Sequence, residues 1–153
     1  AAMLDLDRIG KYREDGRLEA KLATGGLPQS IWETYSAFAN SRGGLILLGV
    51  EELPDHTLRV QGLLDPHEMA EEFWCMVEDP EVVGANILRP EDIWVAGTED
   101  GAVLVIEVPP AQRDQLPVYL GKDPFRGSYR RSGEGDYRCT RAEVWSMLEA
   151  KQH

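Results

Sequence analysis

The chain has 153 residues, of which 42% are hydrophobic and 28% charged, and its net charge is −11. This length and composition favour one globular domain with its own hydrophobic core. No apolar run approaches the roughly 20 residues of a membrane-spanning helix, so we expect no membrane partner. Two cysteines are too few for a disulfide framework and favour a reducing, cytoplasmic location.

The negative charge is concentrated in the middle third of the chain. Residues 51–107 hold fifteen acidic and two basic side chains, whereas residues 1–50 are balanced and residues 108–153 have two more basic than acidic side chains. A net charge of −11 argues against a simple nucleic-acid binder, because binding to phosphates needs a basic face. The two ends of the chain could still meet and form such a face. The alternative is a solvated acidic surface that keeps the protein soluble.

The first third of the chain predicts a helix, a strand and a second helix. Apolar residues recur at near-helical spacing between Leu4 and Tyr12, and residues 17–22 alternate like a strand. Ser30 and Glu33 have the spacing of a capping box at the start of the second helix.

The segment SAFANSRGGLILLGV, residues 36–50, places two glycines between that second helix and an apolar run. One glycine can take the left-handed conformation that closes a helix, and the other lets the chain turn directly into a strand. Residues 45–48 do not alternate, which predicts a central strand covered on both faces. A phosphate-binding loop needs the reverse order, strand before helix. We therefore interpret Gly43 and Gly44 as a structural corner and expect no ATP site.

Residues 57–62 predict a hairpin partner for the strand before them. Asp65, followed by Pro66, predicts the start of a third helix. Residues 93–96 and 102–108 predict two further strands joined by a turn.

A short strand at residues 128–131, a glycine-rich turn at 132–137 and a helix at 140–150 complete the pattern. Thr140 and Glu143 form the predicted capping box of that last helix. The whole predicts a single α+β domain, with a mixed or antiparallel sheet and helices packed on it.

The order of these elements resembles the Schlafen AlbA-type domain, also known as the DNA-binding domain of divergent-AAA and RecG-like bacterial regulators. The likeness runs from about Leu4 to Leu148. The segments that carry it are Leu18–Lys21, Ala37–Asn40, Gly43-Gly44, Leu45–Val50, Gly62, Val103–Val108, Pro117–Tyr119 and Tyr129–Gly133.

This resemblance implies a bacterial, cytoplasmic domain of a transcriptional regulator that binds DNA or RNA and is not catalytic by itself. Many relatives carry further domains after this one, so residues 4–150 could be the N-terminal part of a longer protein. The chain departs from the family at Ala20, where an aromatic residue is usual, and at Glu51-Glu52, where an aspartate is common.

Basic and aromatic residues supply the candidate nucleic-acid site. Arginines contact phosphates, and tyrosines can stack on exposed bases. Residues 122–141 hold six basic and three acidic side chains, with Tyr129 and Tyr137 between them. The candidate residues are Arg17, Lys21, Arg42, Lys122, Arg126, Tyr129, Arg130, Arg131 and Arg138. The alternative is that these arginines form salt bridges with the acidic middle third, in a protein-interaction or homo-oligomerisation module.

Four glutamates supply a second, catalytic alternative. Animal Schlafen relatives include ribonucleases with three carboxylates, and the matching positions are Glu14, Glu19 and either Glu51 or Glu52. Clustered carboxylates bind divalent metal, and Mg²⁺ or Mn²⁺ can activate water for phosphodiester hydrolysis. The non-catalytic hypothesis needs no cofactor. It places Glu14 in a polar helix end, Glu19 in a pair with Lys21 or a nearby arginine, and Glu51-Glu52 in a solvated turn.

The cysteines do not predict a metal or nucleophile site, because no histidine stands at ligand spacing from either. We expect Cys75 to be a packed thiol within its helix. Arg138 and Arg141 could lower the pKa of Cys139, but an ordinary cysteine is the interpretation that we adopt.

Overall fold

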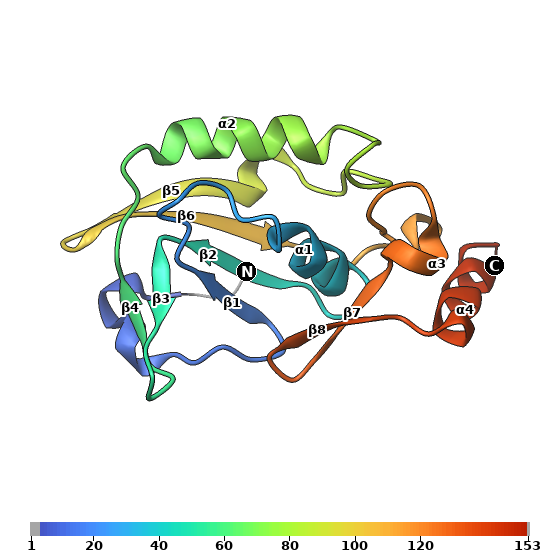
Figure 1. The fold of residues 1–153 in the computed structure, drawn as a ribbon, viewed down its shortest axis with the longest axis horizontal. Helices are drawn as coiled ribbons and strands as arrows, with labels where there is room; N and C mark the ends of the chain where they lie inside the picture. The colour runs from blue at the N-terminus through green and yellow to red at the C-terminus, as the bar shows by residue number, and fades with distance from the viewer. Residues whose placement is uncertain (1–3, 153) are drawn as a thin grey trace.

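The fold is built on a four-stranded mixed sheet (Figure 1). The computed structural model describes residues 4–152. Across the sheet, the strands are β1 (Leu18–Lys21), β2 (Gly44–Leu48), β6 (Gly101–Val108) and β5 (Ile93–Thr98). β1 runs parallel to β2, and the other two pairings are antiparallel. The predicted α+β class is confirmed.

Each face of this sheet is covered by a different set of elements. Helices α1 (Ile31–Ala39) and α2 (Pro66–Val77) pack on one face. The 3-10 helix η1 (Leu6–Lys11) and the hairpin of β3 (Val50–Glu52) and β4 (Leu58–Val60) cover the other. All five residues of β2 are buried, which explains why residues 45–48 show no alternation.

The C-terminal elements are α3 (Pro124–Gly127), the antiparallel hairpin of β7 (Tyr129–Ser132) and β8 (Gly135–Arg138), and α4 (Arg141–Gln152). The short 3-10 helices η2 (Pro90–Asp92) and η3 (Arg113–Gln115) precede them in the chain. Helices α3 and α4 lie at one end of the molecule, β3–β4 lies at the opposite end, and the hairpin β7–β8 lies between them (Figure 1). No described helix is long and apolar enough to cross a membrane.

Two of the three predicted caps are confirmed. The Asp65 carboxylate accepts from the Glu68 N–H at 3.0 Å, and Thr140 and Glu143 form a reciprocal capping box. The prediction of a cap at Ser30 is wrong, because the Ser30 side chain makes no capping hydrogen bond to α1. Its hydroxyl accepts from Lys21 Nζ at 3.1 Å instead. The predicted turn at residues 132–137 is also shorter than expected, since β8 begins at Gly135.

The glycine pair forms the predicted corner between α1 and β2. Gly43 has a φ of +74° and its N–H donates to the Phe38 carbonyl at 2.8 Å, which closes the helix. A Cβ on Gly43 would lie 2.6 Å from the Val108 carbonyl oxygen, and one on Gly44 would lie 2.8 Å from the Phe38 ring. Neither position can hold a side chain without displacing its neighbours.

Gly43→Ala should lower the free energy of unfolding by about 2–4 kcal/mol. The alanine would be strained in the left-handed conformation, and its Cβ would clash with the neighbouring backbone. Urea denaturation followed by circular dichroism measures the loss. Gly25→Ala is the matched control, since a Cβ there meets nothing within 4 Å. Equal stability of the two variants would contradict the prediction.

Candidate nucleic-acid interface and carboxylate cluster

The buried guanidinium of Arg131 joins the N-terminal and C-terminal segments of the chain. Its side chain is only 1% exposed, although Arg131 belongs to the hairpin β7–β8. Nη1 donates to Glu19 of β1 at 2.8 Å and to Asp136 of β8 at 2.6 Å, and Nη2 donates to the Asp15 carbonyl at 2.9 Å. The two ends of the chain therefore do meet.

The cationic state of Arg131 is stabilised by its partners. Burial alone would lower the pKa of this guanidinium, but the hydrogen bonds and charges of Asp136 and Glu19 raise it above its usual value. The guanidinium carbon also lies 4.8 Å from the centroid of the Phe38 ring of α1. Arg131 thus fastens β7–β8 to β1 and to α1.

Asn40 at the end of α1 fixes the same hairpin through its amide. The amide nitrogen donates to the carbonyls of Val118 at 2.8 Å and Tyr129 at 3.0 Å, and the amide oxygen accepts from the Val118 N–H at 2.8 Å. Ser36, one turn earlier, accepts from the Tyr129 N–H at 3.0 Å. Neither residue was predicted to have a role, although an Asn three residues before a glycine corner was a visible signal.

Lys21, like Arg131, makes its contacts inside the fold. Its side chain is 11% exposed and its ammonium lies 3.8 Å from a Glu19 oxygen. The prediction that Glu19 pairs with Lys21 or a nearby arginine is confirmed for both partners.

Three further candidates form salt bridges on the surface. These are Arg130 with Glu143 at 2.9 Å, Lys122 with Glu81 at 3.3 Å and Arg126 with Asp123 at 3.8 Å. Of these partners, only Glu81 lies in the acidic middle third. Exposed pairs are weak and screened by salt, so their cations remain able to exchange partners.

The remaining basic candidates are exposed and have no carboxylate within 4.0 Å among residues 4–152. They are Arg17, Arg42 and Arg138. Arg138 instead lies 6.0 Å from the centroid of the Tyr129 ring.

All three exposed arginines stand close to β7–β8. Arg138 ends β8, and Arg42 follows Ser41, whose hydroxyl accepts from the Arg131 N–H at 3.0 Å. Arg17 follows Gly16, where a Cβ would lie 3.7 Å from the Gly133 carbonyl in the hairpin turn. The acidic middle third supplies β3–β4, α2 and β5, and the last two run along the long axis of the molecule (Figure 1).

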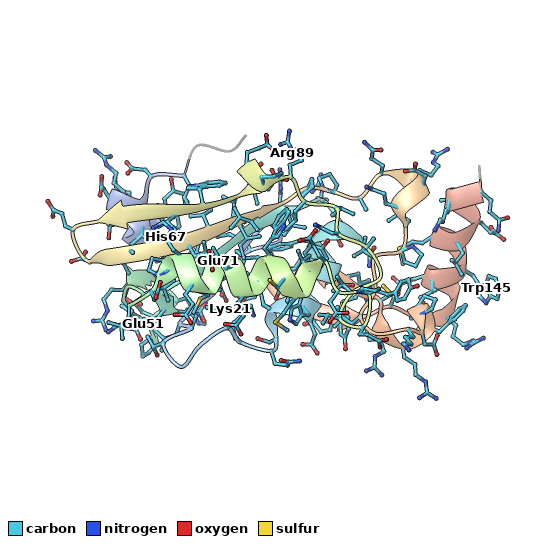
Figure 2. The ribbon with its side chains drawn as sticks, turned by 90° about the horizontal axis from the view of Figure 1, so that it is seen from above. Lys21, Glu51, His67, Glu71, Arg89 and Trp145 are labelled. Carbon is cyan, nitrogen blue, oxygen red and sulfur yellow. The ribbon has the colours of Figure 1, made fainter. Side chains whose placement is uncertain are left out.

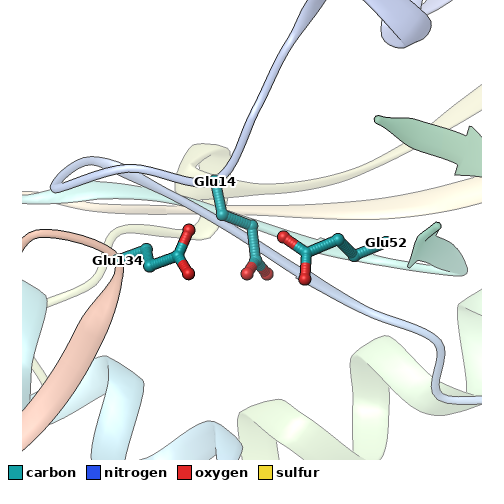
Figure 3. Close-up of side chains that lie close together, drawn as sticks. All are labelled: Glu14, Glu52 and Glu134. Carbon is teal, nitrogen blue, oxygen red and sulfur yellow. The ribbon is translucent and has the colours of Figure 1, made fainter. Parts of the chain in front are cut away.

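A cluster of carboxylates lies at the turn of the hairpin β7–β8. Oxygen atoms of Glu14, Glu52 and Glu134 all lie within 4.8 Å of one another, with Glu14 between the other two (Figure 3). They come from the segment before β1, from the end of β3 and from the turn between β7 and β8. Glu134 was not among the predicted carboxylates, since no local spacing in the sequence relates it to the others.

The structure decides between the two alternatives at positions 51 and 52. Glu51 forms an ion pair with Arg59 across the β3–β4 hairpin, because these residues are register partners. Glu52, on the opposite face of the strand, joins the cluster. Glu19 completes the predicted carboxylate set by a hydrogen bond to Glu14.

The cluster raises the pKa of Glu14 from its ordinary value of 4.5 to about 8. Burial is the largest cause, followed by the hydrogen bond with Glu19 and by the charges of Glu19 and Glu52. The Ala20 N–H, which donates to Glu14 at 2.9 Å, acts in the opposite direction. Convergent carboxylate oxygens fit Mg²⁺ or Mn²⁺, whose charge would hold Glu14 ionised.

The cysteines differ in exposure. Burial raises the pKa of the Cys139 thiol to about 11, so it behaves as the ordinary cysteine that we expected. The expectation of a packed Cys75 is wrong, because this residue is exposed. The apolar stripe of α2 faces the core through Phe73 and Val77, and the helical period turns Cys75 outward.

Comparison with known proteins agrees with the fold. The family model described as "Schlafen, AlbA_2" matches residues 14–140, which is most of the chain. The chain therefore belongs to the Schlafen AlbA_2 family. No curated protein matches it.

The solved structures that resemble the chain include the following two. One is the solution NMR structure of the N-terminal domain of a protein described as related to the ATP-dependent DNA helicase RecG, from Nitrosomonas europaea. It is 30% identical with a TM-score of 0.63, over 88% of this chain and 90% of that chain. The other is the DIP2311 protein of Corynebacterium diphtheriae, at 17% identity and a TM-score of 0.55, where the match covers 88% of this chain but 24% of that one. The second likeness concerns the fold alone.

Glu14→Gln should stabilise the protein more at about pH 9 than at about pH 5. A carboxyl group whose pKa is raised in the folded state contributes fully below its unfolded pKa, and that contribution is lost as pH rises through the folded value. The loss should fall between 4.5 and about 8, and glutamine avoids it while keeping an acceptor for the Ala20 N–H. Urea unfolding at three pH values measures the difference. Glu71→Gln, on the exposed side of α2 (Figure 2), is the control. A pH-independent effect of Glu14→Gln would refute the raised pKa of Glu14.

Proposed function

We propose that this chain is a nucleic-acid-binding domain of a bacterial transcriptional regulator, and that it is not catalytic by itself. The binding face is the surface around the hairpin β7–β8, which we call the hairpin face and define by Arg17, Arg42, Arg130 and Arg138. The observation that carries the proposal is that three of these arginines, Arg17, Arg42 and Arg138, are exposed without a carboxylate partner among residues 4–152, in a protein whose net charge is −11.

Screening limits the effect of the net charge on this face. Exposed charges further apart than the Debye length of about 8 Å at physiological salt are largely screened, so a bound phosphate responds mainly to the charged groups nearest to it. Unpaired guanidinium groups contact phosphates directly, and the Arg130–Glu143 pair can open to supply another. The description of the Nitrosomonas europaea relative as helicase-related supports the same class of ligand.

The fixed part of the site is the scaffold beneath this face. Arg131 and Lys21 both form ion pairs with Glu19. We therefore propose that they position β7–β8 on β1 and do not contact phosphate directly. Arg131→Ala would leave the half-buried Asp136 without its cation and Glu19 with Lys21 alone, and would disturb the fold as well as binding. The exposed arginines therefore give the cleaner test.

Arg42→Ala and Arg138→Ala should each weaken binding to fluorescent DNA or RNA and lower the slope of log K against log salt by about 0.7–0.9. Fluorescence anisotropy at several salt concentrations measures both quantities. Arg59→Ala is the control, because it removes the same charge from β4 at the opposite end. If the wild-type protein binds nothing at low salt, the protein-interaction module is the better assignment; an equal loss in Arg59→Ala would remove the hairpin face as the site.

A metal-dependent ribonuclease is the second candidate function, favoured by the convergence of Glu14, Glu52 and Glu134. These residues would hold Mg²⁺ or Mn²⁺, and a bound metal would supply an activated water for phosphodiester hydrolysis. Glu14 would have to lose its proton on binding, which makes metal affinity rise with pH up to about 8.

Adjacent glutamates provide a matched pair of variants for this candidate. If the cluster is catalytic, Glu52→Ala should lower the rate of Mn²⁺-dependent cleavage of labelled RNA at least about 100-fold, since it removes a metal ligand. Glu51→Ala should cleave like the wild type, because Glu51 pairs with Arg59 outside the cluster. Gel analysis of the products with Mn²⁺ and with EDTA measures the activity. Absence of cleavage by the wild-type protein would leave the cluster without a catalytic role.

A further inference from the structure

Aromatic and arginine side chains alternate where α3, β7–β8 and α4 converge. The rings of Phe125 and Trp145 lie 5.3 Å apart at 59°, and the Arg141 guanidinium lies 4.6 Å from the Phe125 centroid. Arg138 lies 6.0 Å from the ring of Tyr129. We call these five residues, Phe125, Tyr129, Arg138, Arg141 and Trp145, the aromatic corner.

Backbone contacts hold the corner together. The Cys139 N–H donates to the Ser128 carbonyl at 2.9 Å, directly beside the register pair of Tyr129 and Arg138. The Asp123 side chain caps α3 by accepting from the Phe125 N–H at 2.9 Å. Because α4 starts immediately after β8, Arg141 and Trp145 fall one helical turn apart beside Phe125.

Trp145 is left open by this arrangement. α4 inserts Val144 into the protein, while 54% of the Trp145 surface remains exposed on the outer side of the helix (Figure 2). Phe125 contacts it at an angle and leaves much of the indole uncovered. A large exposed aromatic surface marks a binding site when polar groups of suitable chemistry surround it.

The surrounding groups are cations. Among residues 4–152, neither Arg138 nor Arg141 has a carboxylate within ion-pair distance. Arginines that rest on aromatic rings keep the edge of the guanidinium free to donate hydrogen bonds to a phosphate. An open aromatic plane together with unpaired guanidinium groups is the combination that single-stranded nucleic acids bind, since each nucleotide offers a base face and a phosphate.

We propose that the aromatic corner binds single-stranded nucleic acid, with one base stacked on Trp145 and the adjoining phosphates held by Arg138 and Arg141. This inference rests on the proposed nucleic-acid function and specifies its ligand. Base pairs in a duplex stack on one another and do not present a free face to a side chain, so the indole has no partner there. The aromatic corner therefore distinguishes single strands from duplexes and does not read the base sequence.

The experiment compares a labelled single-stranded oligonucleotide, as DNA and as RNA, with the duplex of the same sequence. The wild-type protein should bind the single strand more tightly than the duplex. Trp145→Leu keeps an apolar contact with Phe125 but removes the aromatic plane, and should weaken single-strand binding roughly tenfold to a hundredfold. Trp145→Phe should retain most of the affinity. The single strand should also quench the tryptophan fluorescence of the wild type more than that of Trp145→Phe.

Trp94→Leu is the matched control, because Trp94 is 41% exposed on β5, outside the corner. Thermal unfolding of each variant verifies that the fold is intact. If Trp145→Leu binds single strands like the wild type while Arg138→Ala weakens them, the stacking proposal fails and the nucleic-acid function stands. Equal or tighter binding of the duplex, or an equal loss in Trp94→Leu, also overturns the proposal. If neither form of nucleic acid binds at low salt, both proposals fail together.

Discussion

The buried ion pairs of Arg131 are the interaction on which the rest of this structure depends. A guanidinium that is 1% exposed is costly to bury unless carboxylates and carbonyls satisfy it, and here Glu19, Asp136 and Asp15 do so from two ends of the chain. Breaking one of these partners would leave an uncompensated charge inside the protein. The hairpin β7–β8 is therefore fixed against β1 in one position, and Asn40 adds the same constraint from α1.

That one position creates both candidate sites. At one end of the hairpin, its turn carries Glu134 to Glu14 and Glu52, where burial and the neighbouring carboxylates raise the pKa of Glu14 to about 8. At its other end, Arg138 and Tyr129 meet α3 and α4 in the aromatic corner. Arg131 belongs to neither site, because its guanidinium is buried against Glu19, Asp136 and Asp15. A ligand that carries phosphates would meet the exposed arginines, and a divalent cation would meet the carboxylates.

Part of the segment on which the Schlafen AlbA resemblance rests is structural in this chain. The glycines Gly43 and Gly44 make the corner into β2, and Asn40 joins β7 to α1. This segment thus builds the scaffold that positions the hairpin. The surface residues that we assign to binding lie on the hairpin and on α4, where side chains can vary without loss of the core.

The sequence by itself determined the local structure: the α+β class, the buried central strand, the glycine corner, the hairpin of β3 and β4, and the caps at Asp65 and Thr140. Each depends on residues a few positions apart, whose periodicity, turn chemistry and hydrogen bonding act within one element. Only the tertiary structure decided that Arg131 is buried, that Glu134 joins the carboxylates, that Cys75 faces outward and that Trp145 stands open beside two arginines. These outcomes depend on how the hairpin and helices dock across long separations in sequence, which local patterns do not encode.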